Sequence, residues 1–133
     1  MDEILIASDH AGYGLKKKLS GELARRGYAV REIGTNSNDP TDYADFAHSL
    51  AREVSEGRAK RGVLLCGTGL GMSYVANRCP NVRAAVAWSP EVAEVARSHN
   101  DSNVLVLPAR FVSEEDAKQI LEKWLDTQFE GDG

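Results

Sequence analysis

Short apolar runs alternate along the chain with longer segments in which apolar residues return every three or four positions. The short runs are rich in β-branched and aliphatic residues, which is typical of strands. We predict a strand at each of five runs: ILIAS (4–8), YAVREI (28–33), GVLLC (62–66), RAAVAW (83–88) and NVLVLP (103–108).

Helical spacing fills the segments between these runs. Apolar residues recur every three or four positions through 15–24, before Gly27, and through 43–54, before Gly57. Because glycine commonly ends a helix, both segments are predicted as helices. We expect further helices from about Gly71, after Pro90, and after an N-cap and first turn at 113–116, where Ala117, Ile120, Leu121, Trp124 and Leu125 have the clearest period.

Strands that alternate with helices favour right-handed crossovers and a parallel sheet covered on both faces. We therefore predict one three-layer α/β domain over residues 1–133, built on a five-stranded parallel sheet. Ligands of such sheets bind beyond the carboxyl ends of the strands. The polar stretch GTNSNDPTD (34–42) lies at this edge, is long for a connection, and is a candidate functional loop.

Composition narrows the choice of function. The net charge of −4 provides no general attraction to nucleic acid or to an anionic membrane. No apolar stretch approaches the roughly 20 residues of a membrane span and no signal-peptide pattern is present, so we expect a cytoplasmic protein. In that compartment Cys66 and Cys79 are expected as free thiols. The run KKK (16–18) is expected on a solvated face.

The stretch CGTGLG places Cys66 at the end of the third run and three glycines, Gly67, Gly69 and Gly71, in the turn that follows. Glycines let the backbone turn tightly and present N–H groups to an anion, and they also serve plain packing in a turn. The spacing matches neither a Walker loop nor a dinucleotide fingerprint. Amides near Cys66 would favour a thiolate that acts as nucleophile or base, although Cys66 taken alone fits a small core residue better.

Two further groups of polar residues stand at strand ends. Asp9 and His10 follow the first run, where both reach the same crevice, although Asp9 also fits the N-cap of the next helix. His99 and Asn100 precede the fifth run and hence lie at the opposite end of the sheet from Cys66, unless a second subunit intervenes. On its own, His99 is interpreted as a capping or surface residue.

Five stretches of the chain form one pattern: SDHAGYGLK (8–16), TDYADFA (41–47), CGTGLGMSYVANR (66–78), RAAVAW (83–88) and ARSHNDSNVLVLPAR (96–110). Taken together, they resemble the sugar-phosphate isomerase family that contains ribose-5-phosphate isomerase type B and the galactose-6-phosphate isomerase subunits. The resemblance covers essentially the whole chain. It implies a Rossmann-like fold and a cofactor-free, metal-free aldose–ketose isomerase of the pentose phosphate pathway. It also implies a homodimer or dimer of dimers with active sites shared between subunits.

The resemblance also implies roles for individual residues. Cys66 resembles the base that removes the C2 proton of the open-chain sugar, and His99, brought by a partner chain, resembles the acid that opens the furanose ring. Asp9 matches a residue that contacts the hydroxyl losing its proton on opening, and Thr68 matches one that assists proton movement between O1 and O2. The resemblance further implies that His10 contacts the phosphate and that Gly67, Gly69 and Gly71 donate backbone hydrogen bonds to the enediolate. The other substrate-binding residues, implied as part of the wall of the site, are Tyr43, Ser73, Asn100 and Arg110.

One departure from the family pattern keeps alternatives open. Family members usually continue past QFEG with a basic segment whose arginines bind phosphate, whereas this chain reads QFEGDG (128–133). The alternatives are a shortened chain, phosphate held by His10 and Arg110, another substrate such as an allose, galactose or tetrose phosphate, or a catalytically silent sugar-phosphate-binding subunit. A nucleotide or flavin domain of the flavodoxin type is a further alternative that fits the fold, but this chain has no matching phosphate-binding loop. We expect an isomerase of ribose 5-phosphate and ribulose 5-phosphate that acts through an enediolate.

Overall fold

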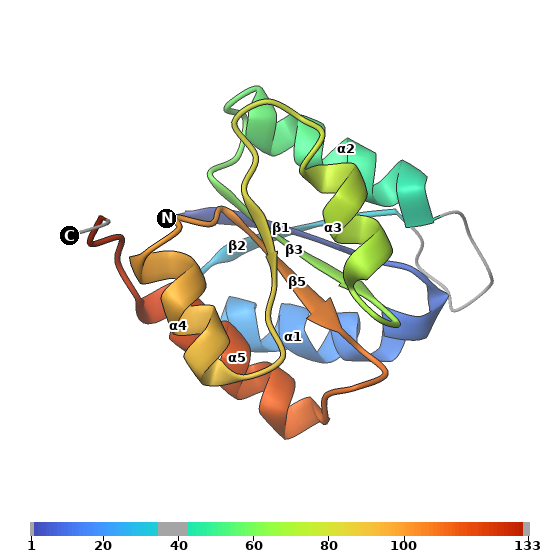
Figure 1. Ribbon diagram of the computed structural model, residues 1–133. Coiled ribbons are helices and arrows are strands. Elements are labelled where there is room, and N and C mark those ends of the chain that lie inside the picture. The colour runs from blue at the N-terminus through green and yellow to red at the C-terminus, as the bar shows by residue number, and fades with distance from the viewer. Residues whose placement is uncertain (1, 35–42, 132–133) are drawn as a thin grey trace.

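Five parallel strands form the middle layer of the molecule, as the alternation of apolar runs predicts (Figure 1). The computed structural model describes residues 2–34 and 43–131, and for Tyr43 the backbone alone. Apart from Gly34, the predicted functional loop 34–42 lies outside the described residues. The elements in chain order are β1 (Glu3–Ser8), η1 (His10–Gly12), α1 (Tyr13–Arg25), β2 (Ala29–Ile33), α2 (Tyr43–Ser55), β3 (Arg61–Cys66), α3 (Leu70–Ala76), β4 (Ala84–Val86), α4 (Pro90–Ser98), β5 (Val104–Pro108) and α5 (Glu114–Asp126).

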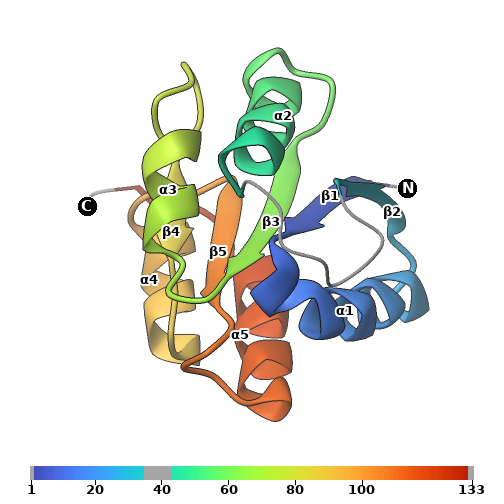
Figure 2. The same ribbon diagram turned by 90° about the vertical axis from the view of Figure 1, so that its right-hand side faces the viewer.

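Two helical layers cover the sheet. Because successive side chains of a strand point to opposite faces, each buried strand contributes to two separate cores. Ile4 and Ile6 of β1 pack in the core that includes α1, α4 and α5 residues, whereas Leu5 and Ala7 pack in the core that includes α2 and α3 residues. Figures 1 and 2 show the same division, with α2 and α3 on one side of the sheet and α1, α4 and α5 on the other. The predicted three-layer α/β fold is confirmed.

The order of the strands locates a crevice. The sheet runs β2-β1-β3-β5-β4, so the chain leaves β1 toward one edge and returns at β3 to build the other half. The strand order reverses between β1 and β3, and ligands of open α/β sheets bind at such a point, beyond the carboxyl ends of the strands. A backbone hydrogen bond joins the carboxyl ends of β1 and β3, since Asp9 N donates to Leu65 O at 3.1 Å.

Three local predictions need correction. The predicted strand 83–88 is shorter, because Ser89 already accepts from Val92 N as the N-cap of α4 and the chain must turn. The Asp9 side chain caps the short η1 helix and not α1 itself. Lys16, expected on a solvated face, is fully buried, and its ammonium pairs with Glu32 at 3.4 Å.

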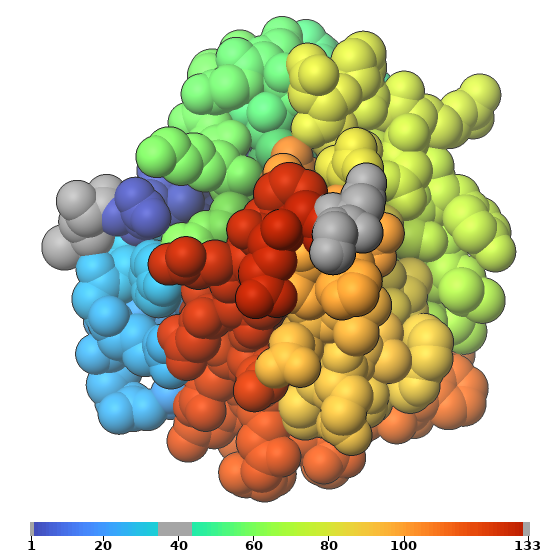
Figure 3. Space-filling model, turned by 60° about the vertical axis from the view of Figure 1, so that its left-hand side comes forward, coloured from blue at the N-terminus to red at the C-terminus, as the bar shows by residue number. Residues whose placement is uncertain are grey.

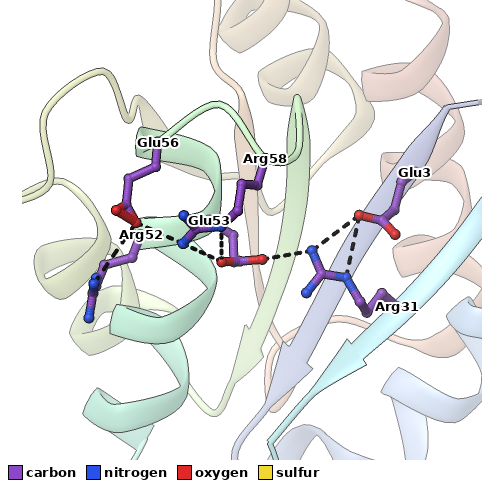
Figure 4. A network of polar contacts seen from close by, with 6 residues as sticks. All are labelled: Glu3, Arg31, Arg52, Glu53, Glu56 and Arg58. Atoms are coloured by element: carbon purple, nitrogen blue, oxygen red, sulfur yellow. Dashed lines mark hydrogen bonds and ion pairs between the residues drawn. The ribbon is translucent and has the colours of Figure 1, made fainter.

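A network of ion pairs links α2 to the first two strands (Figure 4). Arg31 of β2 donates to Glu53 of α2 at 2.8 Å and to Glu3 of β1 at 3.2 Å. Arg58, in the turn after α2, donates to the other oxygen of Glu53 at 2.6 Å and to Glu56 at 2.7 Å. Glu53 is thus the carboxylate shared by the two halves of the network, and hydrogen bonds from Arg58 and Arg31 hold its pKa below the usual range.

We expect Glu53→Gln to lower the melting temperature at pH 7, because two guanidinium groups lose their shared carboxylate. A carboxyl whose pKa is depressed on folding stabilises the fold above its unfolded pKa of about 4.3, and that stabilisation is lost as the pH falls through the folded value. The difference between the variant and the wild type should therefore vanish in acid and shrink in high salt. Thermal melts from pH 2 to 7 measure it. Glu56→Gln removes the pairs with Arg58 and Arg52 at the end of the network and leaves Arg31 bonded to Glu53, so it should have the smaller effect. Equal effects would contradict the central place of Glu53.

Candidate active site

A pocket of about 250 Å³ opens at the carboxyl ends of β1, β3 and β5, beside the point where the strand order reverses. Its wall combines a thiol, a carboxylate, a hydroxyl, a guanidinium and two glycines. In Figure 2 the segments that follow β1 and β3 meet at this edge of the sheet. The lining residues are Asp9, Cys66, Gly67, Thr68, Gly71 and Arg110.

The turn after β3 aims backbone amides at the Cys66 sulfur. Gly69 has φ +80°, a left-handed conformation that suits glycine, and a Cβ there would lie 3.2 Å from Val86 Cγ1. This conformation lets the chain enter α3 at once, so the N–H groups of Thr68, Gly69 and Met72 face the sulfur. The arrangement matches the predicted donors at a helix start.

Burial dominates the electrostatics of this cysteine. Cys66 is only 5% exposed, and burial raises the pKa of its thiol above the ordinary value. The amides of Met72, Gly69 and Thr68 lower that pKa, while the nearby Asp9 carboxylate raises it further. The net pKa is raised, so the neutral thiol is the main form of Cys66 near pH 7. The predicted stabilising amides are present, but they do not outweigh desolvation.

Thr68 and Ser73 both bond to the first residue of α3. The Leu70 N–H donates to Thr68 Oγ1 at 3.2 Å, which leaves the hydroxyl proton of Thr68 available to the pocket. The Ser73 hydroxyl is buried and donates to Leu70 O at 2.7 Å. Ser73 and Gly69 are not among the residues that line the pocket, whereas Thr68 is.

Asp9 and Arg110 bring opposite charges to the pocket. The Asp9 carboxylate accepts from Gly12 N at 3.0 Å and caps η1, while its second oxygen carries no bond to a described residue. The Arg110 side chain lies across Gly67, where an added Cβ would lie 3.2 Å from Arg110 Cδ. His10 is exposed in η1 and does not line the pocket.

His99 and Asn100 lie away from Cys66 within one chain. His99 is the exposed C-cap of α4 and lines a groove with the segment after α5. That segment passes the C-terminal end of α4, since Glu130 N donates to Ser98 O at 2.9 Å (Figure 3). Asn100 lines an apolar hollow with Val92 and Val95. The predicted wall residue Tyr43 begins α2, and its side chain is outside the description.

The described residues contain neither a metal-binding cluster of side chains nor a membrane-spanning helix. Among residues 2–34 and 43–131, no group of three or more His, Cys, Asp or Glu side chains is placed to hold a metal ion. Within the same part of the chain, no helix has the length and apolar character to cross a membrane.

Comparison with known proteins identifies close relatives. A family model described as Ribose/Galactose Isomerase matches residues 4–133. Ribose-5-phosphate isomerase B of Escherichia coli is 41% identical over 131 residues, which are 98% of this chain and 88% of that protein. D-erythrulose-4-phosphate isomerase of Pectobacterium atrosepticum is 40% identical over 137 aligned positions, covering 100% of this chain and 88% of that protein. A crystal structure of ribose-5-phosphate isomerase B from Mycoplasma genitalium with bound ribulose-5-phosphate superposes with a TM-score of 0.94 at 40% identity, covering 97% of this chain and 86% of that one.

Proposed function

Since the chain belongs to the ribose/galactose isomerase family, we propose that it is a sugar-phosphate isomerase that interconverts ribose 5-phosphate and ribulose 5-phosphate. The observation that carries this proposal is the pocket that joins Cys66 to the Asp9 carboxylate and to a glycine turn rich in amides. Such a site supplies the base and the fixed donors that an enediolate requires. The relative with bound ribulose-5-phosphate supports the choice of pentose.

The first step is opening of the furanose ring. His99 protonates the ring oxygen as the C1–O bond breaks, and the C1 hydroxyl gives its proton to Asp9. Histidine suits this task because its ordinary pKa lies near neutrality. The oxygen of Asp9 that is not bonded to Gly12 is available as the acceptor.

The second step moves a proton between two carbons. The Cys66 thiolate takes the C2 proton, and the electron pair passes to the carbonyl oxygen to give an enediolate. The amides of Gly67 and Gly71, on the pocket wall, stabilise the negative charge. Thr68 passes a proton between O1 and O2, and the Cys66 thiol returns its proton to C1, which yields the ketose.

We place the phosphate at the positive side of the pocket. Arg110 provides a fixed guanidinium on the wall, and a guanidinium fork suits phosphate oxygens. His10, exposed one residue beyond Asp9, is the second group that we assign to the phosphate. Tyr43, Ser73 and Asn100 keep their assignment as further substrate-binding residues.

We assign a homodimer, alone or paired into a dimer of dimers, with each site shared between subunits. Cys66 ends β3, whereas His99 precedes the amino end of the neighbouring β5, so one chain does not hold both at one pocket. A second copy supplies the missing histidine. Exposed apolar side chains suit such contact, and they include Leu70, Tyr74, Trp88, Val95 and Phe111. The same proposal places the enzyme in the cytoplasm and its reaction in the pentose phosphate pathway.

The experiment that tests this function is an isomerisation assay on the purified chain. We expect ribose 5-phosphate to be turned over with kcat/KM of about 10⁴ M⁻¹s⁻¹ or more, with no added metal or cofactor. Erythrulose 4-phosphate, galactose 6-phosphate and allose 6-phosphate are assayed in parallel as alternative substrates. Faster turnover of erythrulose 4-phosphate would instead assign this chain the activity for which its Pectobacterium relative is named. Binding of ribose 5-phosphate without turnover of any sugar would indicate a silent binding subunit.

A further inference from the structure

Gly12 occupies a position that has no room for a side chain. It is the buried last residue of η1. A Cβ added there would lie 2.8 Å from Leu65 Cβ, 3.1 Å from Leu65 O and 3.2 Å from Leu65 C. Real Cβ atoms do not approach other atoms so closely, so any side chain at Gly12 must push η1 and β3 apart.

Of these two elements, η1 is the one that would move. Leu65 is fully buried, and its side chain packs in the core shared with α1 and α5. Its strand is hydrogen-bonded to β1 on one side and to β5 on the other. In contrast, η1 is a turn of three residues at the rim of the pocket. A side chain at Gly12 therefore displaces the Asp9–Gly12 turn and leaves the strand in place.

Asp9 depends on this contact through two hydrogen bonds. Its N–H donates to Leu65 O at 3.1 Å, and its carboxylate accepts from Gly12 N at 3.0 Å. Leu65 is followed directly by Cys66, and both Asp9 and Cys66 line the pocket. We propose that Gly12 is a positioning residue: its missing side chain lets η1 seat on Leu65, and that seat holds the Asp9 carboxylate beside the Cys66 sulfur.

The placement has an electrostatic signature. The negative charge of Asp9 raises the pKa of the Cys66 thiol, as burial does more strongly. Among the described residues, the charged side chains on the pocket wall are Asp9 and Arg110, while the turn after β3 and the start of α3 face the sulfur with backbone amides. Moving Asp9 outward therefore weakens a charge that disfavours the thiolate. Cys66 should then lose its proton at lower pH, even as the group that receives the substrate's hydroxyl proton is misplaced.

The test measures turnover and the alkylation of Cys66 on one set of variants, all carrying Cys79→Ser so that Cys66 is the single thiol. We expect Gly12→Ala to lower kcat by about 10- to 100-fold with little change in KM, because small misplacements of catalytic groups cost this much. We also expect the alkylation of Cys66 by iodoacetamide, monitored by mass spectrometry of the intact protein, to begin at lower pH in this variant than in the parent.

Two other glycines provide matched controls. An added Cβ at Gly14, in the first turn of α1, meets nothing within 4 Å, so Gly14→Ala should leave both readouts unchanged. An added Cβ at Gly62, inside β3, would lie 2.5 Å from Leu50 Cδ2 in the α2 layer. Gly62→Ala should therefore lower the melting temperature without shifting the pH profile of alkylation. Gly62→Ala thus shows what a loss of stability does on its own, without a displaced Asp9.

Asp9→Asn decides whether Gly12 acts through Asp9. Asparagine keeps an acceptor for Gly12 N and removes the charge, so this variant should shift the alkylation of Cys66 to lower pH on its own. Combined with Gly12→Ala, the shift should be smaller than the sum of the two single shifts. Fully additive shifts would overturn the proposal, as would a parental alkylation profile in folded Gly12→Ala. If Gly12→Ala does not fold, an unshifted profile in Asp9→Asn overturns it.

The proposal rests on the assigned roles of Asp9 and Cys66, but turnover and alkylation distinguish a failure of the isomerase function from a failure of the role of Gly12. Absence of turnover in the parent protein would remove the isomerase function and leave the alkylation data intact. Normal turnover in the parent, with unshifted alkylation in every variant, would remove the role of Gly12 and leave the isomerase function intact.

Discussion

Replacement of Cys66 by alanine is expected to lower kcat/KM for ribose 5-phosphate by about 10⁴-fold, near the upper end of what a single acid–base group contributes. The sulfur is nearly buried at the end of β3, and alanine fills most of the same volume, so the pocket should survive the change. Binding of the sugar phosphate, measured by calorimetry, should change by less than about threefold, because the base acts on the transition state more than on the bound sugar.

The wild-type pH profile belongs to the same prediction. Because burial raises the pKa of Cys66, the thiolate is the minor form near pH 7 and its fraction grows with pH. We therefore expect proton exchange from the open-chain sugar, a step that does not use the His99 acid, to speed up from neutral into alkaline pH. A flat profile through this range would argue against a thiolate base.

Cys79 provides the control for this substitution. It is a half-buried free thiol in the turn after α3 and does not line the pocket. Cys79→Ala should therefore keep the wild-type turnover. If Cys66→Ala retained more than about a tenth of the wild-type kcat/KM, another group would have to be the base.

His99→Ala is expected to lower turnover of ribose 5-phosphate by about 10²- to 10³-fold, since ring opening loses its acid. The histidine is exposed at the C-cap of α4, so the substitution should leave the melting temperature nearly unchanged. The stronger test mixes this variant with Cys66→Ala after partial unfolding and refolding. In a mixed dimer with shared sites, one of the two pockets has both Cys66 and His99.

Random reassociation makes half of the dimers mixed, and half of the pockets in each are intact, so about a quarter of the wild-type activity should return. Native mass spectrometry confirms that mixed dimers have formed. Mixed dimers without any gain in activity would contradict the sharing of sites, and so would a monomeric wild type with full activity.

The sequence was informative about the fold wherever burial alone decides local structure. Runs such as GVLLC and NVLVLP are apolar because both faces of β3 and β5 are covered, and both strands were predicted within one residue. Prediction was weaker at the sheet edge, where β4 pairs with β5 alone and ends as the N-cap of α4 takes over. Lys16 could not be placed from spacing, because its partner Glu32 belongs to a different element.

The site shows a similar division. Asp9, Cys66 and Thr68 could be assigned to one pocket because they lie at or just beyond the carboxyl ends of β1 and β3, which are adjacent parallel strands. Gly12 was missed, since its close approach to Leu65 is a tertiary contact between segments far apart in the chain. The signal was present as the glycine in SDHAG, which reads as an ordinary turn residue until β3 is seen beside it. The roles assigned to Tyr43, Ser73, His99 and Asn100 stay predictions.

Exchange of the substrate C2 proton with solvent tests the role of Cys66 most directly. Ribose 5-phosphate is incubated in D₂O with the wild type or with Cys66→Ala, and the C2 proton is followed by NMR. We predict that the wild type replaces this proton with deuterium, while Cys66→Ala binds the sugar phosphate and exchanges it no faster than buffer does. Exchange by Cys66→Ala at the wild-type rate would contradict the assignment of Cys66 as the base.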